Sequence, residues 1–255
     1  MKRLSKKYLG ICSVLIICGC CWNVVAVADT ETKINRTVLF QPPPEESQPE
    51  ETEGAASRQG RVCSQEVTSS SDETLNNLTA IVPTSNYGLT VAERPSFWVY
   101  LPETSATQLI LTLKKPGRNP HWQQAVNLPE QSGIVGIKLS DEAPALEMNE
   151  EYQWAVILVC GNKPNPNDPV VTAKVKRVNK SSVVLNSSRD NNTPIEKAAV
   201  YAREGIWHDS LDILIKEKPS TNNWNYIWIN YLQSAGLNEI SDEPVVGRLN
   251  DIEKE

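Results

Sequence analysis

Hydrophobic and polar positions alternate over short stretches in the middle of the chain, which is the pattern of half-buried β-strands. Residues 78–101 hold three such runs, Leu78–Val82, Leu89–Ala92 and Ser96–Leu101, each followed by a turn-forming sequence. In the third run both faces carry large side chains. We therefore expect this strand to be covered on both sides, near the centre of a two-layer β structure.

The alternation continues over four further runs that also predict strands. They are Leu109–Leu113, Val135–Leu139, Tyr152–Cys160 and Val170–Val178. The last two flank a loop rich in proline and asparagine and predict a β-hairpin. Seven or eight short strands at regular spacing favour an antiparallel β-sandwich over residues 62–180. It is immunoglobulin-like in architecture only, because its two cysteines lie too far apart for a true immunoglobulin domain.

The hydrophobic period changes from 2 to 3.6 towards the end of the chain. The run Thr193-Pro194-Ile195-Glu196 is a capping box with proline at the first helical position, and Gly205 ends that helix. Two more helices are predicted at about 208–216 and 222–235, so the fold class is α+β. The spacing of aromatic and small residues resembles a tetratricopeptide repeat. One repeat does not bury its own core, so we expect the segment 193–240 to pack on the sandwich.

The N-terminus has the three parts of a secretory signal over residues 1–28. Four basic residues precede a short apolar run, and a small-x-small sequence predicts cleavage between Ala28 and Asp29. The minor alternative is a lipoprotein acylated at Cys20. Both interpretations place the protein outside the cytoplasm, in the periplasm or outside the cell. No later stretch is apolar for long enough to form a transmembrane helix.

The residue composition on either side of the predicted domain differs from that of a folded region. Residues 29–61 are rich in proline, glutamate and serine and predict a disordered linker, and residues 241–255 predict an acidic tail. Removal of the signal takes away four basic residues and no acidic one, so the net charge falls from −6 to −10. Nucleic acid or an anionic membrane is not expected as a partner, because either requires a basic surface.

Two of the six cysteines, Cys63 and Cys160, remain after removal of the signal. In an oxidising compartment such a pair predicts a structural disulfide. Closing a loop of 97 residues stabilises a fold by about 4–5 kcal/mol on the chain-entropy view. A catalytic thiol is the alternative, but no histidine is placed by the sequence to activate it.

Candidate chemistry is sparse. The only histidines, His121 and His208, are interpreted as structural or exposed. No motif of the common hydrolases, zinc peptidases or nucleotide enzymes is present in the mature sequence. The loop 165–168 offers too few carboxylates for a calcium site. Five carboxylates near strand ends are the remaining candidates for a glycosidase pair, and we interpret them as solvated. They are Asp141, Glu142, Glu147, Glu150 and Glu151. We therefore assign no catalytic, cofactor-binding or metal-binding residue.

Aromatic residues are numerous and allow two interpretations. Most are expected in the core and between the sandwich and the helices, whereas any that are exposed on a sandwich would be able to stack on sugars. They are Trp98, Tyr100, Trp122, Trp154, Trp207, Trp224 and Trp228.

Several separated blocks resemble the signature of an exported cyanobacterial family known as domain of unknown function 928. The blocks are Leu78–Pro83, Gly88–Pro95, Phe97–Tyr100, Tyr152–Trp154 leading into Leu158–Cys160, Tyr201–Leu211 and Ala235–Leu237. The likeness spans roughly Arg61 to Val246. Ahead of Cys63 the chain has only Gly60, where a longer glycine run is expected. The resemblance implies an exported protein, and it supplies no catalytic residue because the family's activity is unknown.

These observations lead to one expectation and two alternatives for function. We expect an exported, non-enzymatic cell-envelope protein that acts as a protein-interaction or structural module and needs no cofactor. The partner is then another envelope protein. A carbohydrate-binding module, with a glycan as ligand, is the first alternative. An unfamiliar carboxylate-dependent hydrolase is the second.

Overall fold

The computed structural model describes residues 37–43, 59–60, 63, 77–117, 122–180 and 193–249, all within one compact unit that spans residues 36–255. The predicted signal 1–28 with its cleavage site at Ala28 and Asp29, the alternative lipidation site Cys20, His121 and the end of the acidic tail lie outside the described residues. Among the helices described, none is long and apolar enough to cross a membrane.

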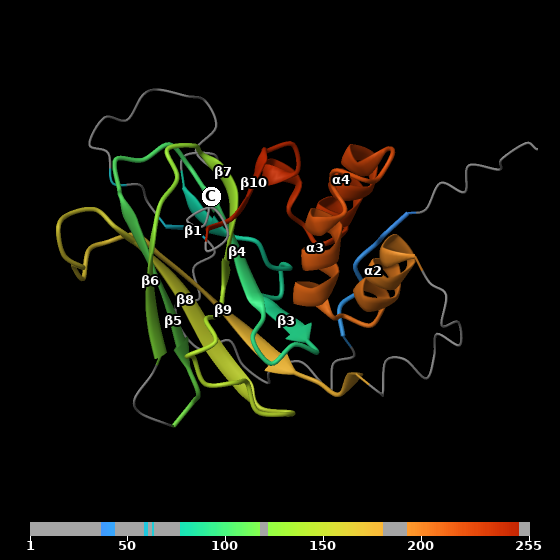
Figure 1. Ribbon diagram of the computed structural model, residues 1–255, viewed down its shortest axis with the longest axis horizontal. Helices are drawn as coiled ribbons and strands as arrows, with labels where there is room; N and C mark the ends of the chain where they lie inside the picture. The colour runs from blue at the N-terminus through green and yellow to red at the C-terminus, as the bar shows by residue number, and fades with distance from the viewer. Residues whose placement is uncertain are drawn as a thin grey trace, which may run out of the picture. The chain divides into compact units, whose positions relative to one another are not determined.

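Over the described residues the fold is α+β, with two mixed β-sheets and three α-helices that lie between β9 and β10 in the chain (Figure 1). The first sheet has the order β1-β2-β4-β7-β10, and the second has the order β3-β9-β8-β5-β6. The first consists of β1 (Gln59–Gly60), β2 (Leu78–Ala80), β4 (Ser96–Leu101), β7 (Gly133–Lys138) and β10 (Val245–Arg248). The second consists of β3 (Tyr87–Thr90), β5 (Gln108–Lys114), β6 (Trp122–Asn127), β8 (Glu151–Val159) and β9 (Val170–Arg177).

The sheets are mixed, which corrects the expectation of a purely antiparallel structure. Strand β3 pairs in parallel with β9, and β10 pairs in parallel with β7, whereas the other pairs are antiparallel. Parallel neighbours need a long connection. The chain between β7 and β10 supplies one, because it holds two strands of the other sheet and the three helices. Sequence alternation identifies such strands but does not show their direction.

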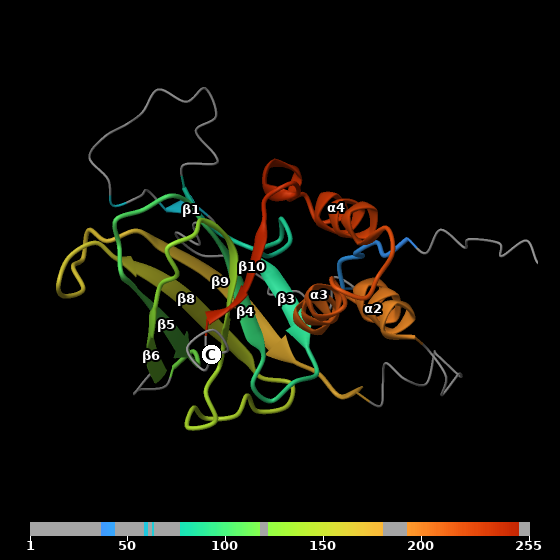
Figure 2. The same ribbon diagram turned by 45° about the horizontal axis from the view of Figure 1, so that its top comes forward.

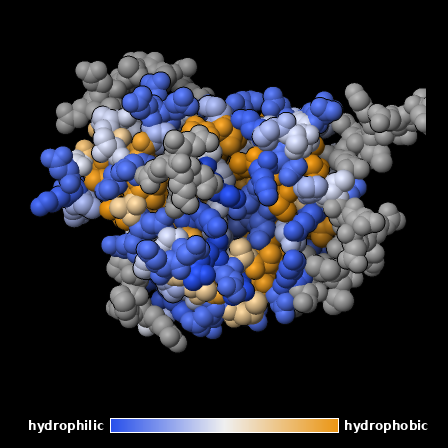
Figure 3. Space-filling model, in the orientation of Figure 1, coloured by the Kyte–Doolittle hydropathy of each residue, from blue (hydrophilic) through white to orange (hydrophobic). Residues whose placement is uncertain are grey.

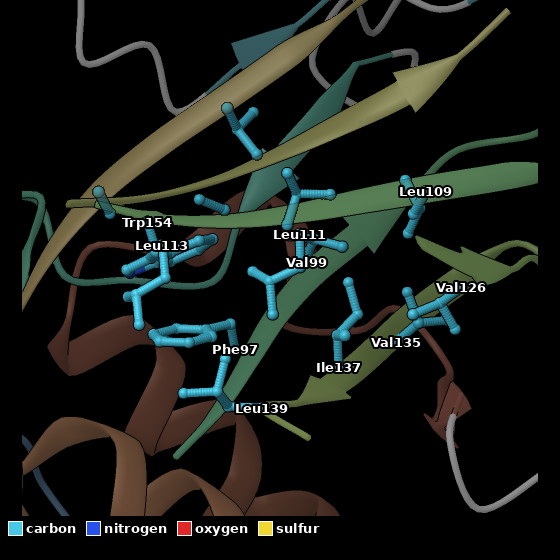
Figure 4. Close-up of a cluster of buried hydrophobic side chains, with 14 of the residues drawn as sticks. Phe97, Val99, Leu109, Leu111, Leu113, Val126, Val135, Ile137, Leu139 and Trp154 are labelled. Atoms are coloured by element: carbon cyan, nitrogen blue, oxygen red, sulfur yellow. The ribbon is translucent and has the colours of Figure 1, made fainter. Parts of the chain in front are cut away.

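One face of each sheet contributes side chains to a common core (Figure 4). Phe97 and Val99 of β4 meet Leu111 of β5 and Trp154 of β8 in this cluster, and Phe97 and Trp154 have ring centroids 4.9 Å apart. The alternating burial of β5 and β8 follows the period-two pattern of their sequences. The predicted hairpin is confirmed, because β8 and β9 pair antiparallel over their length.

The opposite face of the first sheet is covered by the helices (Figures 1 and 2). All six residues of β4 are buried, because Trp98 and Tyr100 point into a second apolar cluster that the helices share. Gly136 lies directly across from Trp98, and a Cβ atom at this position would come within 2.7 Å of the indole ring. The missing side chain at residue 136 therefore makes room for the tryptophan.

The helices are α2 (Pro194–Arg203), α3 (Trp207–Lys216) and α4 (Trp224–Ser234), followed by the short 3-10 helix η2 (Asn238–Ile240). The capping box predicted for α2 is present, with Thr193 and Glu196 bonded to each other's backbone N–H groups. Gly205 follows α2 with φ of +74°, a conformation that favours glycine and ends the helix.

The stretch after His121, for which the sequence leaves a loop or an edge strand open, forms β6 at the edge of the second sheet. Two segments differ from their predicted state. Strand β10 lies in the predicted acidic tail, where its two valines are held by pairing with β7. Residues 37–43 lie in the predicted disordered linker, yet Val38 and Phe40 are 0 % and 5 % exposed in the helical cluster. These two apolar side chains bring an otherwise polar segment into the fold.

Candidate functional site

Helix α3 is held on the sheets by two carboxylates on one of its faces. Asp209 accepts hydrogen bonds from the Thr90 hydroxyl at 2.7 Å and from the backbone N–H of Val91 at 3.0 Å. The spacing of three residues places Asp212 on the same side of the helix, above β4. Burial is the main reason why the pKa of Asp209 is raised, although its two hydrogen bonds oppose the shift.

Asp212 joins three groups from two strands of the first sheet. It accepts hydrogen bonds from the indole N–H of Trp98 at 2.7 Å and from the hydroxyl of Ser96 at 3.0 Å, both on β4. Its carboxylate also lies 3.0 Å from Arg248 on β10. The aspartate thereby provides an acceptor for the buried Trp98 N–H and joins the last strand to the helix.

The side chain of His208, the second residue of α3, is enclosed between this helix and the first sheet and is 2 % exposed. Its ring makes an edge-on contact with Phe97, with ring centroids 5.4 Å apart, and Gly88 lies close to its Nε2. Burial lowers the pKa of His208 to about 4, and the nearby Ser96 carbonyl opposes this shift only in part. The imidazole is therefore neutral at physiological pH.

Ser96, His208 and the two aspartates contain the residue types of a hydrolytic triad, but their arrangement is structural. The Ser96 hydroxyl donates to Asp212 and not to the imidazole. Ser96 and His208 are each 2 % exposed, so a substrate does not reach them. A nucleophile must be bonded to its base and accessible to act. This cluster fixes α3 on the sheets.

A surface cavity of about 550 Å³ lies at the start of β10, where this strand meets two loops. The wall is formed by the loops 102–104 and 129–132, by residues 244–246 at the start of β10, and by Leu101. The wall is apolar at its proline and valine residues, and Glu103 and Glu130 are exposed at its edge. No histidine, cysteine or lysine is among the described residues that line it. The cavity can hold an apolar group next to a cation, and it lacks a nucleophile activated by a base.

Acidic side chains continue from this cavity to the other side of the chain at the start of β10. The Tyr100 hydroxyl bonds to Glu243, and the pKa of Tyr100 rises to about 12 through burial, then through the charges of Glu243 and Glu103. Glu243 also lines a smaller cavity of about 150 Å³, next to the stacked indole rings of Trp224 and Trp228. The two cavities share Pro244 and Val245, so acidic groups lie on both sides of this segment.

The other carboxylates that the sequence singles out are paired with lysines or exposed. Glu147 and Glu150 both approach Lys115, at 2.8 and 3.4 Å, and Glu151 lies 3.0 Å from Lys174. Asp141 and Glu142 are exposed. In the loop 165–168, Asp168 accepts hydrogen bonds from backbone N–H groups of its own loop and of Cys160. Its oxygens thus stabilise the turn.

Most of the tryptophans are enclosed and present no flat surface to a sugar. Trp98, Trp154, Trp207, Trp224 and Trp228 are at most 7 % exposed. Of the aromatic residues that the sequence singles out, only Trp122, on the edge strand β6, is half-buried. Sugar binding by stacking needs an accessible ring, so the described tryptophans favour packing as their main role.

Cys63 and Cys160 form a disulfide, with their Cα atoms 5.1 Å apart. The bond connects the start of the family-like region to the end of β8. Its sulfur atoms are oxidised and partnered, so neither cysteine acts as a nucleophile in this state.

Sequence reasoning missed Asp209, Asp212 and the cavity beside β10. The aspartates have a local signal, because they lie three residues apart among apolar residues of a predicted helix. The cavity has none, because it is formed by two loops and the start of β10, which are distant from one another in sequence. The mostly hydrophilic surface in Figure 3, with hydrophobic patches among charged residues, likewise depends on folding.

The class of protein is set by a two-sheet, three-helix domain stabilised by one disulfide. The model of the family described as Domain of Unknown Function (DUF928) matches residues 53–245, about three quarters of the chain. This chain belongs to that family. A search of curated proteins finds no match.

Proposed function

We propose that this protein is an exported, non-enzymatic protein of the cell envelope, and that it binds another protein through the cavity beside β10. We also propose that its two sheets form a sandwich, and that α2 and α3 correspond to one tetratricopeptide-like helix pair. The cavity is the single observation that carries the proposed function, because it combines a concave shape, apolar proline and valine side chains in its wall and two exposed carboxylates.

The chemistry of the cavity indicates the kind of partner. Pro102, Pro129 and Val246 offer apolar surface, and Glu103 and Glu130 offer negative charge at the edge. A partner segment with an apolar side chain next to lysine or arginine complements both features. The negative charge of the mature chain adds long-range attraction for such a partner.

The test is affinity capture from an envelope extract with the full-length mature protein as bait. Wild type is compared with a Glu103→Lys, Glu130→Lys double variant. The matched control is Asp141→Lys, Glu142→Lys, which makes the same change of charge at exposed residues beyond the other end of β7. The expected result is a protein retained by wild type and by the control and lost by the cavity variant.

The same experiment separates the alternatives. Equal loss of the captured protein in both double variants contradicts the cavity as the site. Capture of no protein, together with binding to a glycan panel, favours the carbohydrate-binding module, for which the exposed Tyr226 and the half-buried Trp122 are the available rings. Intact-mass analysis of the exported protein tests the expected N-terminus at Asp29 against a lipidated Cys20.

A further inference from the structure

Residues 37–43 run alongside the three helices (Figures 1 and 2), and their apolar side chains share a buried cluster with side chains of α2, α3 and α4. We call this set of helical contacts the groove. The segment is extended, and burial alternates along it: Val38 and Phe40 are enclosed, whereas Leu39 between them is 48 % exposed. Pro43 is buried at the far end. This is the pattern of an extended peptide that is held by selected side chains, here at positions 38, 40 and 43.

The floor of the groove is aromatic. Phe40 meets Trp207 of α3 edge-on, with ring centroids 5.0 Å apart, and Trp207 stacks on Tyr231 of α4 at 4.8 Å. Trp207 is fixed from below by a 2.8 Å hydrogen bond from its indole N–H to the carbonyl of Ile81. The pocket for Phe40 is therefore built from side chains that have partners of their own.

The backbone of the segment is also recognised. The N–H of Phe40 donates to the Ser234 hydroxyl at 2.8 Å, and the N–H of Gln41 donates to the Ala202 carbonyl at 2.9 Å. The first acceptor is a side-chain hydroxyl in the last turn of α4, and the second is a backbone carbonyl in the last turn of α2. Gly205 lets Pro43 approach, because a Cβ atom at residue 205 would lie 2.8 Å from the proline nitrogen.

The groove and its occupant belong to different parts of the chain. The helices lie within the matched range 53–245, and residues 37–43 lie before it. The family domain thus contains a groove that an adjoining segment fills. The segment's contacts include two backbone hydrogen bonds and three buried side chains, and every copy of the chain carries the same sequence.

We propose that the groove of α2, α3 and α4 is a docking site for an extended segment with the pattern Val-x-Phe-x-x-Pro, and that the segment 37–43 of a second copy binds there in exchange for the chain's own. When two copies exchange this segment, each contact within one chain is replaced by the identical contact between chains. The fraction of exchanged dimer therefore depends on the protein concentration. The site is separate from the cavity beside β10.

The test uses the full mature chain and a labelled synthetic peptide of residues 36–44. Wild type has its groove filled by its own segment, whereas Phe40→Asp puts a charge in the aromatic pocket and releases it. We expect the peptide to bind Phe40→Asp at least about 10-fold more tightly than wild type, because the competing segment is removed. A Leu39→Ala peptide should bind equally well, and a Phe40→Asp peptide should not bind.

Sedimentation should show dimers of the wild-type protein that increase with protein concentration and are absent for the Phe40→Asp protein.

Equal binding of the wild-type and Phe40→Asp peptides overturns the groove as a specific site, and wild type that stays monomeric at every concentration overturns exchange between copies. If Phe40→Asp does not fold, as judged by circular dichroism, Phe40→Ala replaces it, because it leaves the pocket empty without adding charge. The Glu103→Lys, Glu130→Lys variant should bind the peptide as wild type does. The result for the groove is thereby separated from the result for the cavity beside β10 as a protein-binding site.

Discussion

At the scale of single residues, the stability of this fold depends on polar groups that are buried with their charge states set by the surroundings. His208 is the clearest case, because it is enclosed between α3 and β4 and its pKa is lowered to about 4. At a pH between this value and the ordinary pKa of histidine, the unfolded chain binds a proton on His208 and the folded chain does not. Stability contributed by neutral His208 is therefore present at pH 7 and is lost as the pH falls from about 6.5 towards 4.

We expect His208→Asn to remove this part of the pH dependence. Urea unfolding of wild type should show a loss of about 3 kcal/mol from this group over that pH window, since each pKa unit corresponds to about 1.4 kcal/mol. Asp209 titrates in the opposite sense, because its raised pKa makes the folded chain bind a proton more readily, so the comparison must be made between variants. His121→Asn is the control for the other histidine. An unchanged pH profile in His208→Asn contradicts the assignment.

The sequence identified the types of these residues and left their roles open. His208 and Asp209 were visible as neighbours at the start of a helix, but the depth of their burial depends on which strand the helix covers. Trp98 was predicted in a strand covered on both sides, and the structure confirms that burial. Its partners Asp212 and Gly136 are far away in sequence, so no local pattern indicates them.

At the scale of elements, α3 acts as the connection between the sheets and the other helices. Asp212 accepts from Trp98 and Ser96 and pairs with Arg248, and a variant that lacks the carboxylate takes this acceptor away from the Trp98 N–H and the Ser96 hydroxyl. We expect Asp212→Ala to lower the free energy of unfolding by about 3 kcal/mol, because two of the donors are buried. Urea denaturation measures this, with the exposed Lys216→Ala on the same helix as control. A loss no larger than that of the control contradicts a structural role for Asp212.

Elements with strong local signals were predicted well, and those held by tertiary contacts were not. The bounds of α2 follow from its capping box and Gly205, and β5, β7, β8 and β9 follow from alternation. Strand β10 has only two valines to indicate it, and its pairing with β7 becomes possible after the helices have carried the chain back across the sheet. The segment 37–43 is ordered by the helical groove, which composition does not reveal.

At the scale of the whole molecule, we expect the sheets and the helices to unfold together. The second apolar cluster contains Trp98, Tyr100 and Ile134 of the first sheet along with side chains of all three helices. Separation of the helices would expose these large side chains and leave the Trp98 N–H without Asp212, so neither layer keeps its buried surface alone.

Amide hydrogen exchange across a urea series tests this expectation. Peptides from α3 and from β4 should give opening free energies within about 1 kcal/mol of each other, as members of one cooperative unit do. Asp212→Ala should lower both values by the same amount, because it weakens the contact that the two elements share. If α3 exchanges through a much less costly opening while β4 keeps its protection, the helices form a separate unit. The groove that holds residues 37–43 would then open without unfolding of the sheets.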